Sequence, residues 1–154
     1  MKALLLALAM LAVLPAWAGA RQEGKALMEE GAAGQIEEEW GFSSALITGD
    51  TLYLSGVVAG LREGETDLGV AYDRAFKRIG AVLEKAGASW DDVVDITSFH
   101  TDVTAQMPAI VAVKNRYVSK PYPAWTAIQV SRLIPPNGIT EIKIVAKLPK
   151  ITVR

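Results

Sequence analysis

An amphipathic pattern between Asp67 and Gly87 constrains the fold of this chain more than any other feature of its sequence. Apolar residues recur at intervals of three and four, as on one buried face of an α-helix: Leu68, Ala71, Tyr72, Ala75, Phe76, Ile79, Val82 and Leu83. Gly87 follows Lys85 and Ala86, where a glycine commonly ends a helix. A helix with one oily face needs a second layer of structure to cover that face.

Segments rich in β-branched and aromatic residues predict that second layer. We expect a hairpin around Gly49-Asp50, followed by strands over residues 93–101, 124–131 and 140–148. A second helix is expected over about 104–117, with Thr104 as its N-cap and Pro108 in its first turn. This order predicts an α+β domain with two helices packed on one face of a mixed sheet.

The alternation along the last two strands predicts what the second sheet face carries. We expect Ala124, Thr126, Ile128 and Val130 to share the helix-covered face with Ile142, Ile144 and Ala146. The opposite face then collects Trp125, Gln129, Glu141 and Lys143. A large aromatic beside a carboxylate on an open sheet face indicates a subunit interface or a pocket.

The first twenty residues have the pattern of a secretory signal peptide. Lys2 precedes an apolar run over residues 3–14, and the small-x-small sequence 16–18 follows. We predict a signal peptide over 1–18, cleaved after Ala18 or alternatively after Ala20. The run is shorter than the ~20 residues of a membrane span, so an uncleaved anchor is the less favoured alternative. The mature protein is therefore expected in the periplasm or outside the cell, with no stable membrane insertion.

The remaining chain divides into a short leading segment and one domain. Residues 19–41 are acidic and punctuated by glycine, with few apolar positions at helical spacing, and predict a mobile acidic lead-in. Residues 42–154 are long enough to bury a core of their own.

Composition excludes several kinds of site. The chain has no cysteine and a single histidine, His100, so disulfides, thiolate nucleophiles and multi-histidine metal centres are not expected. We predict no metal and no cofactor. A formal net charge of −1 gives no general attraction to polyanions, so no nucleic-acid partner is expected.

Four motifs in order carry a family resemblance. They are residues 49–56 (GDTLYLSG), 86–89 (AGAS) with 92–94 (DVV), 122–124 (YPA) and 141–146 (EIKIVA). In this order and spacing they resemble the RidA/YjgF family of imine and enamine deaminases, also labelled endoribonuclease L-PSP proteins. The resemblance implies a chorismate-mutase-like fold and a homotrimer, with small-molecule sites in the three clefts between subunits.

The resemblance also implies site residues. Ser55 and Gly56 match ligand-binding positions, and Glu141 matches the carboxylate that positions the hydrolytic water. Family enzymes carry a tyrosine, an asparagine, an arginine and a cysteine at positions that match Phe42, Val111, Trp125 and Ala127 here. An indole offers one neutral N–H, whereas a guanidinium makes two charge-assisted bonds to a carboxylate. We therefore expect inefficient processing of the usual small 2-imino acids, while an aromatic, neutral or cationic ligand fits an indole face.

Plainer interpretations stand beside these. Glu141 is either a catalytic carboxylate or a solvated strand residue, and His100 is either catalytic or structural. Trp125 is either an interface plug or a pocket wall. Four functions follow: hydrolysis of an imine or enamine, non-catalytic binding of a small molecule by a trimer, a disfavoured ribonuclease activity, and a pure interaction role for the acidic lead-in.

Overall fold

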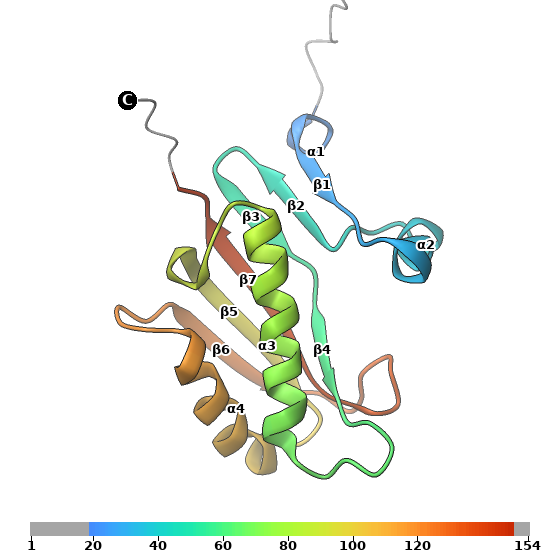
Figure 1. The fold of residues 1–154 in the computed structure, drawn as a ribbon, viewed down its shortest axis with the longest axis vertical. Helices are drawn as coiled ribbons and strands as arrows, with labels where there is room; N and C mark the ends of the chain where they lie inside the picture. The colour runs from blue at the N-terminus through green and yellow to red at the C-terminus, as the bar shows by residue number, and fades with distance from the viewer. Residues whose placement is uncertain (1–18, 150–154) are drawn as a thin grey trace, which may run out of the picture.

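A seven-stranded mixed sheet with two long helices on one face makes up most of the computed structural model, which describes residues 19–149 (Figure 1). The strands lie in the order β1-β2-β3-β7-β5-β6, and β4 also pairs with β7. Within the described sheet, β5 and β6 form the parallel pair and the other pairs are antiparallel. Their bounds are β1 (Lys25–Leu27), β2 (Ala45–Thr48), β3 (Thr51–Leu54), β4 (Val57–Gly60), β5 (Val93–His100), β6 (Ala124–Gln129) and β7 (Gly138–Lys147).

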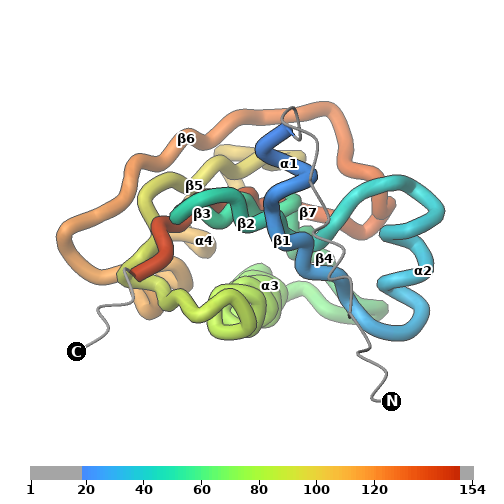
Figure 2. Tube along the Cα trace, turned by 90° about the horizontal axis from the view of Figure 1, so that it is seen from above, coloured from blue at the N-terminus to red at the C-terminus, as the bar shows by residue number. Residues whose placement is uncertain are grey.

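The predicted helices are present and lie on the same side of the sheet, α3 (Leu68–Lys85) and α4 (Val103–Tyr117) (Figure 2). Asp67 caps α3 by accepting a hydrogen bond from the Gly69 N–H at 2.7 Å. The predicted Thr104 cap of α4 is wrong. The cap is Asp102, which accepts from the Ala105 N–H at 3.0 Å because the chain enters the helix two residues after β5 ends.

The core lies between these helices and the sheet. Tyr72, Phe76, Ile79 and Leu83 of α3 are at most 1% exposed and face buried strand residues, among them Leu52, Ile96, Ile142 and Ile144. Burial of each large apolar side chain contributes about 1.5–3 kcal/mol. The helix periodicity seen in the sequence is therefore the periodicity of the main hydrophobic interface.

One strand of the predicted sheet faces the other way. Trp125 is in register with buried Ile96, and residues paired across parallel strands project to the same face. Trp125 and Gln129 therefore lie on the helix-covered face, and Ile128, which was expected there, lies on the open face and is 44% exposed. The prediction fails because β6 is an edge strand with apolar residues at both its odd and its even positions. Its pattern therefore does not determine which set of side chains faces the helices.

Residues 19–41 contain regular structure that the sequence does not indicate: α1 (Ala20–Glu23), β1 and α2 (Gly31–Trp40). β1 pairs with β2 and buries Leu27. The predicted signal peptide over residues 1–18 lies outside the described residues. Among residues 19–149, no helix is both long enough and apolar enough to cross a membrane.

Side-chain contacts hold this N-terminal segment against the domain. Lys85, at the end of α3, donates to the Met28 carbonyl at 3.1 Å, and Thr48 of β2 donates to the Ala20 carbonyl at 3.2 Å. One buried leucine and a few backbone bonds suffice to dock the segment, and neither leaves a periodic pattern in the sequence. The interpretation of residues 19–41 as a segment without docked elements therefore differs from the structure.

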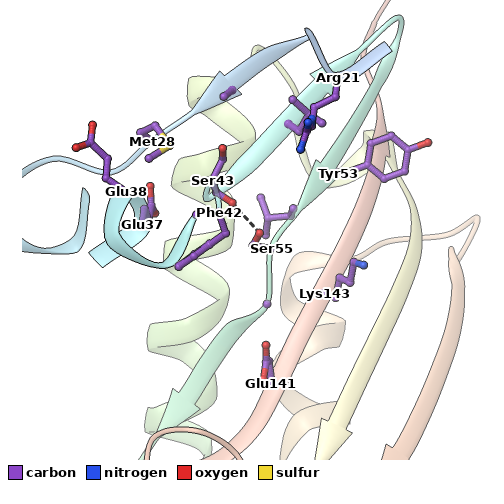
Figure 3. Close-up of a pocket in the computed structure, with 15 residues that line it drawn as sticks. Arg21, Met28, Glu37, Glu38, Phe42, Ser43, Tyr53, Ser55, Glu141 and Lys143 are labelled. Atoms are coloured by element: carbon purple, nitrogen blue, oxygen red, sulfur yellow. Dashed lines mark hydrogen bonds between the residues drawn. The ribbon is translucent and has the colours of Figure 1, made fainter. Parts of the chain in front are cut away.

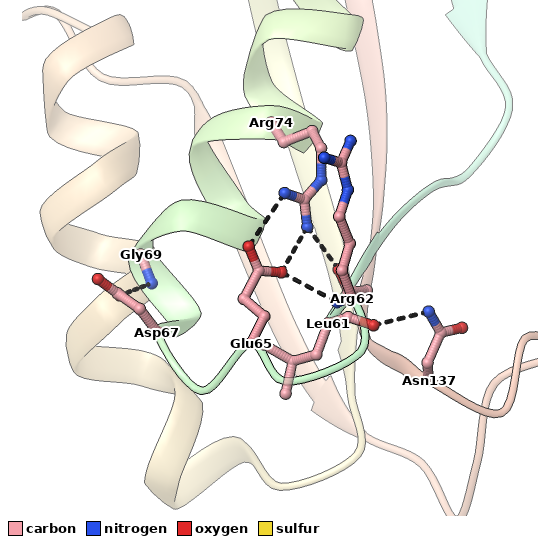
Figure 4. A network of polar contacts seen from close by, with 8 residues as sticks. Leu61, Arg62, Glu65, Asp67, Gly69, Arg74 and Asn137 are labelled. Carbon is pink, nitrogen blue, oxygen red and sulfur yellow. Dashed lines mark hydrogen bonds and ion pairs between the residues drawn. The ribbon is translucent and has the colours of Figure 1, made fainter.

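The loop between β4 and α3 is fastened by an ion pair (Figure 4). Glu65 accepts hydrogen bonds from the Arg74 guanidinium at 2.7 and 3.2 Å and from the Arg62 N–H at 3.0 Å. Arg74 also donates to the Gly60 carbonyl at 2.8 Å, which ties the loop to the end of β4. The hydrogen bonds from Arg74, and then the backbone bond from Arg62, lower the pKa of Glu65 from 4.5 to about 2.

This lowered pKa predicts a pH-dependent stability. The Glu65 carboxylate stabilises the folded state fully above pH 4.5, and that contribution is lost as pH falls from 4.5 toward about 2. Glu65→Gln should therefore lower the melting temperature above pH 4.5 and make progressively less difference below it. Thermal melts of both proteins from pH 7 to pH 2 measure this, and a gap that stays constant throughout would contradict the assignment.

Candidate active site

An interruption between β3 and β4 creates the site. Both strands pair with the same side of β7, Tyr53 opposite Val145 and Val57 opposite Ile142. Ser55 and Gly56 occupy the interruption. The Ser55 hydroxyl donates to the Ser43 carbonyl at 2.7 Å, and its N–H donates to the Ser44 carbonyl at 2.9 Å. The backbone here is thus fixed by the loop before β2 rather than by the sheet.

Glu141 of β7 lies against the Gly56 backbone. A Cβ at residue 56 would overlap the Glu141 carboxylate and lie 2.7 Å from Glu141 Cγ, so no larger residue fits here without displacing the glutamate. Glycine at this position therefore lets a carboxylate pack directly on the main chain where the sheet opens.

A cavity of about 720 Å³ opens in front of this pair (Figure 3). Its lining combines the N-terminal segment, the loop before β2, β3 and β7. Four residues predicted from the sequence meet there: Phe42, Ser55, Gly56 and Glu141. Phe42 is placed by the end of α2, where Gly41 adopts the left-handed conformation (φ 71°) and the Phe42 N–H donates to the Glu37 carbonyl at 3.0 Å.

Lys143, which the alternation along β7 predicts beside Glu141, also lines the cavity, whereas sequence reasoning missed Arg21, Glu37 and Tyr53. Tyr53 of β3 is 44% exposed. Glu37 is 4% exposed, and its carboxylate accepts hydrogen bonds from the Ser44 hydroxyl and, at 3.0 Å, from the Glu29 N–H. No sequence signal brings α1 and α2 to the cavity.

The structure does not bring Val111, Trp125 and Ala127 to this cavity. Trp125 and Ala127 lie in register with Ile96 and Ser98, on the helix-covered face, and Val111 is on α4. The Trp125 Nε1–H donates to Ser98 Oγ at 2.9 Å, so the indole's one donor is already used. Lys114 of α4 lies near the indole, with its Nζ 5.3 Å from the ring centroid.

His100 belongs to a buried polar network on that same face. It is fully buried and opposite Thr140, while Glu141 projects from the other face of β7. A consistent proton arrangement has Nδ1–H donating to Gln106 Oε1 at 3.2 Å and Nε2 accepting from the Ser98 hydroxyl at 2.9 Å. Burial lowers the pKa of His100, which favours this neutral form. The structure thus places His100 in the core, apart from the cavity.

No group of three or more His, Cys, Asp or Glu side chains within residues 19–149 is arranged to hold a metal ion.

Comparison with known proteins decides the family. The model of the family described as "Endoribonuclease L-PSP" matches residues 33–148. The RutC family protein YjgH of Escherichia coli is 40% identical over 112 residues, which cover 71% of this chain and 84% of that protein. The chain belongs to the RidA/YjgF family. A 2-iminobutanoate/2-iminopropanoate deaminase of Dermatophagoides farinae is 34% identical to this RidA/YjgF chain over 106 residues, 66% of this chain and 81% of the relative.

Solved structures show that this RidA/YjgF chain also has the family fold. The structure of protein YjgH aligns with a TM-score of 0.69 at 38% identity, covering 83% of this chain and 98% of that one. RidA from an Antarctic Psychrobacter aligns with a TM-score of 0.62 at 31% identity, covering 80% of this chain and 94% of that one. The sequence prediction of an α+β RidA/YjgF fold is confirmed.

The contact between Gly56 and Glu141 predicts a coupled pair of substitutions. Gly56→Ala should lower the free energy of unfolding by about 1–3 kcal/mol, because the added methyl group forces the glutamate or the strand to move. In a Glu141→Ala background the same change should cost much less, since the overlapping carboxylate is gone. Denaturant unfolding of the four proteins in this cycle measures the coupling. Equal costs in both backgrounds would show that the contact does not constrain residue 56.

Proposed function

We propose that this RidA/YjgF protein hydrolyses an imine or enamine at the Glu141 cavity. The observation that supports the proposal most directly is the carboxylate held against the Gly56 backbone in a cavity large enough for a small ligand. A relative from Dermatophagoides farinae that is named as a deaminase of 2-imino acids supports the reaction type.

The chemistry assigned to Glu141 is general acid–base catalysis. Its carboxylate orients a water and accepts a proton from it as the oxygen adds to the imine carbon, which gives a carbinolamine. The proton then passes from Glu141 to the nitrogen, and as the nitrogen leaves as an amine or ammonia the carbinolamine hydroxyl returns its proton to the Glu141 carboxylate and the carbonyl forms. In this proposal the Ser55 hydroxyl and the Gly56 backbone orient the substrate, and the bond from Ser55 to Ser43 fixes that hydroxyl.

We further propose that the functional form is a homotrimer. The matched positions Trp125 and Ala127 lie on one sheet face and Glu141 on the other, so a single copy cannot bring both groups to one ligand. A contact between two different faces is heterologous, and repetition of such a contact forms a closed ring when the rotation between neighbouring copies is a whole fraction of a turn. Three copies, the arrangement implied by the family resemblance, would give three clefts, each lined by residues of two subunits.

The substrate is proposed to differ from the usual small 2-imino acids. Trp125 stands where family enzymes use arginine, and its N–H is engaged by Ser98. Loss of a bidentate pair with the substrate carboxylate should cost about 2–5 kcal/mol of binding. The same replacement supports the second candidate function, a trimer that binds a small molecule without turnover. A ribonuclease activity is disfavoured, because a net charge of −1 provides little attraction for a phosphate backbone.

Glu141→Gln tests the proposed catalysis. The amide keeps the size of the side chain but cannot accept the proton, so imine turnover should fall about 100-fold or more while ligand binding persists. Release of the carbonyl product from imines generated in situ, from acidic, neutral and aromatic amines, measures this. Glu38→Gln, at the same cavity on the α2 side, is the matched control and should change turnover less than twofold (a factor of ~2 is ~0.4 kcal/mol).

The outcomes separate the two candidate functions. Turnover that survives Glu141→Gln would contradict the role assigned to Glu141. A folded trimer that binds ligands but turns over none of the imines would establish the non-catalytic binding function instead.

Export is a separate proposal with its own test. Residues 1–18 have the pattern of a cleaved leader, so the protein recovered from the periplasm or the medium should begin at Gly19 or Arg21. Mass spectrometry of the intact protein distinguishes these two ends. Recovery of a chain that still begins at Met1, in the cytoplasm or in the membrane fraction, would contradict the prediction.

A further inference from the structure

Two basic side chains from distant parts of the chain line one side of the Glu141 cavity. Arg21 comes from α1 and Lys143 from β7, and Figure 3 shows both on the side of the cavity that carries Tyr53. Glu37 and Glu38 lie on the opposite side, on α2. The cavity therefore has a basic wall formed by Arg21 and Lys143, which neither the proposed hydrolysis nor the family resemblance uses.

Arg21 reaches this wall through a segment that the family model does not include. The model matches residues 33–148, whereas α1 and β1 precede that range. Pairing of β1 with β2, burial of Leu27 and the bonds to the Ala20 and Met28 carbonyls dock the segment. Its position at the cavity is thus fixed by packing and by several hydrogen bonds.

The charges of the basic wall are not neutralised within the described residues. The ion pairs there involve Arg74, Lys77, Arg116 and Lys147, and none involves Arg21 or Lys143. The Glu37 carboxylate is occupied by hydrogen bonds from Ser44 and Glu29. A cavity wall with two unpaired cations is suited to bind a carboxylate group.

The spacing along β7 indicates where that carboxylate would lie in the ligand. Glu141 and Lys143 are two residues apart on one strand face, so their Cα atoms are about 6.5–7 Å apart. In a ligand whose imine carbon lies at Glu141, the group that contacts Lys143 is therefore several bonds away from that carbon. The geometry favours an anionic group at the far end of the ligand over one attached directly to the imine carbon.

We propose that Arg21 and Lys143 bind a carboxylate at the distal end of the ligand, and that residues 19–32 act as a specificity element by presenting Arg21. This inference rests on the proposed function for the location of the reacting carbon. The substrate class is an imine with a carboxylate three or four bonds from the reacting carbon, and the carbonyl product formed from it is expected to bind through the same carboxylate.

A matched substrate pair tests the inference in the mature protein. 4-Iminobutanoate and 4-iminobutanamide, generated in situ by oxidation of the corresponding amines, differ in the distal carboxylate. Lys143→Met and Arg21→Met should each reduce kcat/KM for the carboxylate about tenfold, the effect of losing one charge-assisted bond, and leave the amide within about twofold. Lys147→Met is the control, because Lys147 is on the same strand but paired with Asp50 at 2.7 Å. Equal losses on both substrates would overturn the inference while leaving the hydrolase function intact.

A binding measurement keeps the inference testable if no imine is turned over. Calorimetric titration with 4-oxopentanoate and 4-oxopentanamide should show tighter binding of the carboxylate, and both substitutions should remove that preference. If the wild-type protein binds the two compounds equally, or if Lys147→Met changes the preference as much as Lys143→Met, the inference is wrong. Arg21 and Lys143 are both exposed, so melting temperatures close to that of the wild type are expected for these variants.

Discussion

Contact between the Glu141 side chain and the Gly56 backbone is the constraint on which the architecture of the site depends. β7 pairs with β3 and β4 on one side, and the Glu141 side chain packs against Gly56 in the interruption between these two short strands. The chain leaves the sheet there and is held by carbonyl groups of Ser43 and Ser44 instead. The Glu141 carboxylate thereby lies in the cavity, against the Gly56 backbone, where the strand pairing is interrupted.

The remaining elements can be understood from how they support this junction. α3 and α4 cover the face that carries Ile142 and Ile144, which keeps β7 rigid and leaves Glu141 and Lys143 on the open side. The buried network around His100 has a similar effect on β5, because it satisfies Ser98, Gln106 and Thr140 without solvent. Polar groups on the covered face thus contribute to order, and those on the open face are available for a ligand.

Much of the fold could be predicted because its main interface is periodic. The spacing of apolar and turn residues predicts three of its features: the apolar face of α3, the hairpin around Gly49 and the alternation along β7. β1 and α2 leave none, since their docking depends on Leu27, on the buried carboxylate of Glu37 and on backbone bonds. β6 forms where the sequence predicts a strand, but its side chains face the opposite way from the prediction, because Trp125 and Ile128 give both of its faces an apolar member.

The site was predictable to the extent that it is local in sequence. Ser55 and Gly56 are adjacent in the sequence and end one family motif. Glu141 begins another motif, on the strand that pairs with β3 and β4. Arg21 and Lys143 are 122 positions apart in the chain (143 minus 21). They line the same cavity because β1 joins the edge of the sheet, and this depends on tertiary docking and not on composition or period.

The shortness of β1 has a further consequence, for association between molecules. A sheet edge exposes unpaired N–H and C=O groups that can template the strand of another chain. β1 covers the edge of β2 with three residues, among them Lys25. Gly24 precedes this strand, and α2 is the next element after it. So brief and charged an edge offers few bonds to an incoming strand. The segment that carries Arg21 to the cavity therefore also protects this side of the sheet from edge-to-edge aggregation.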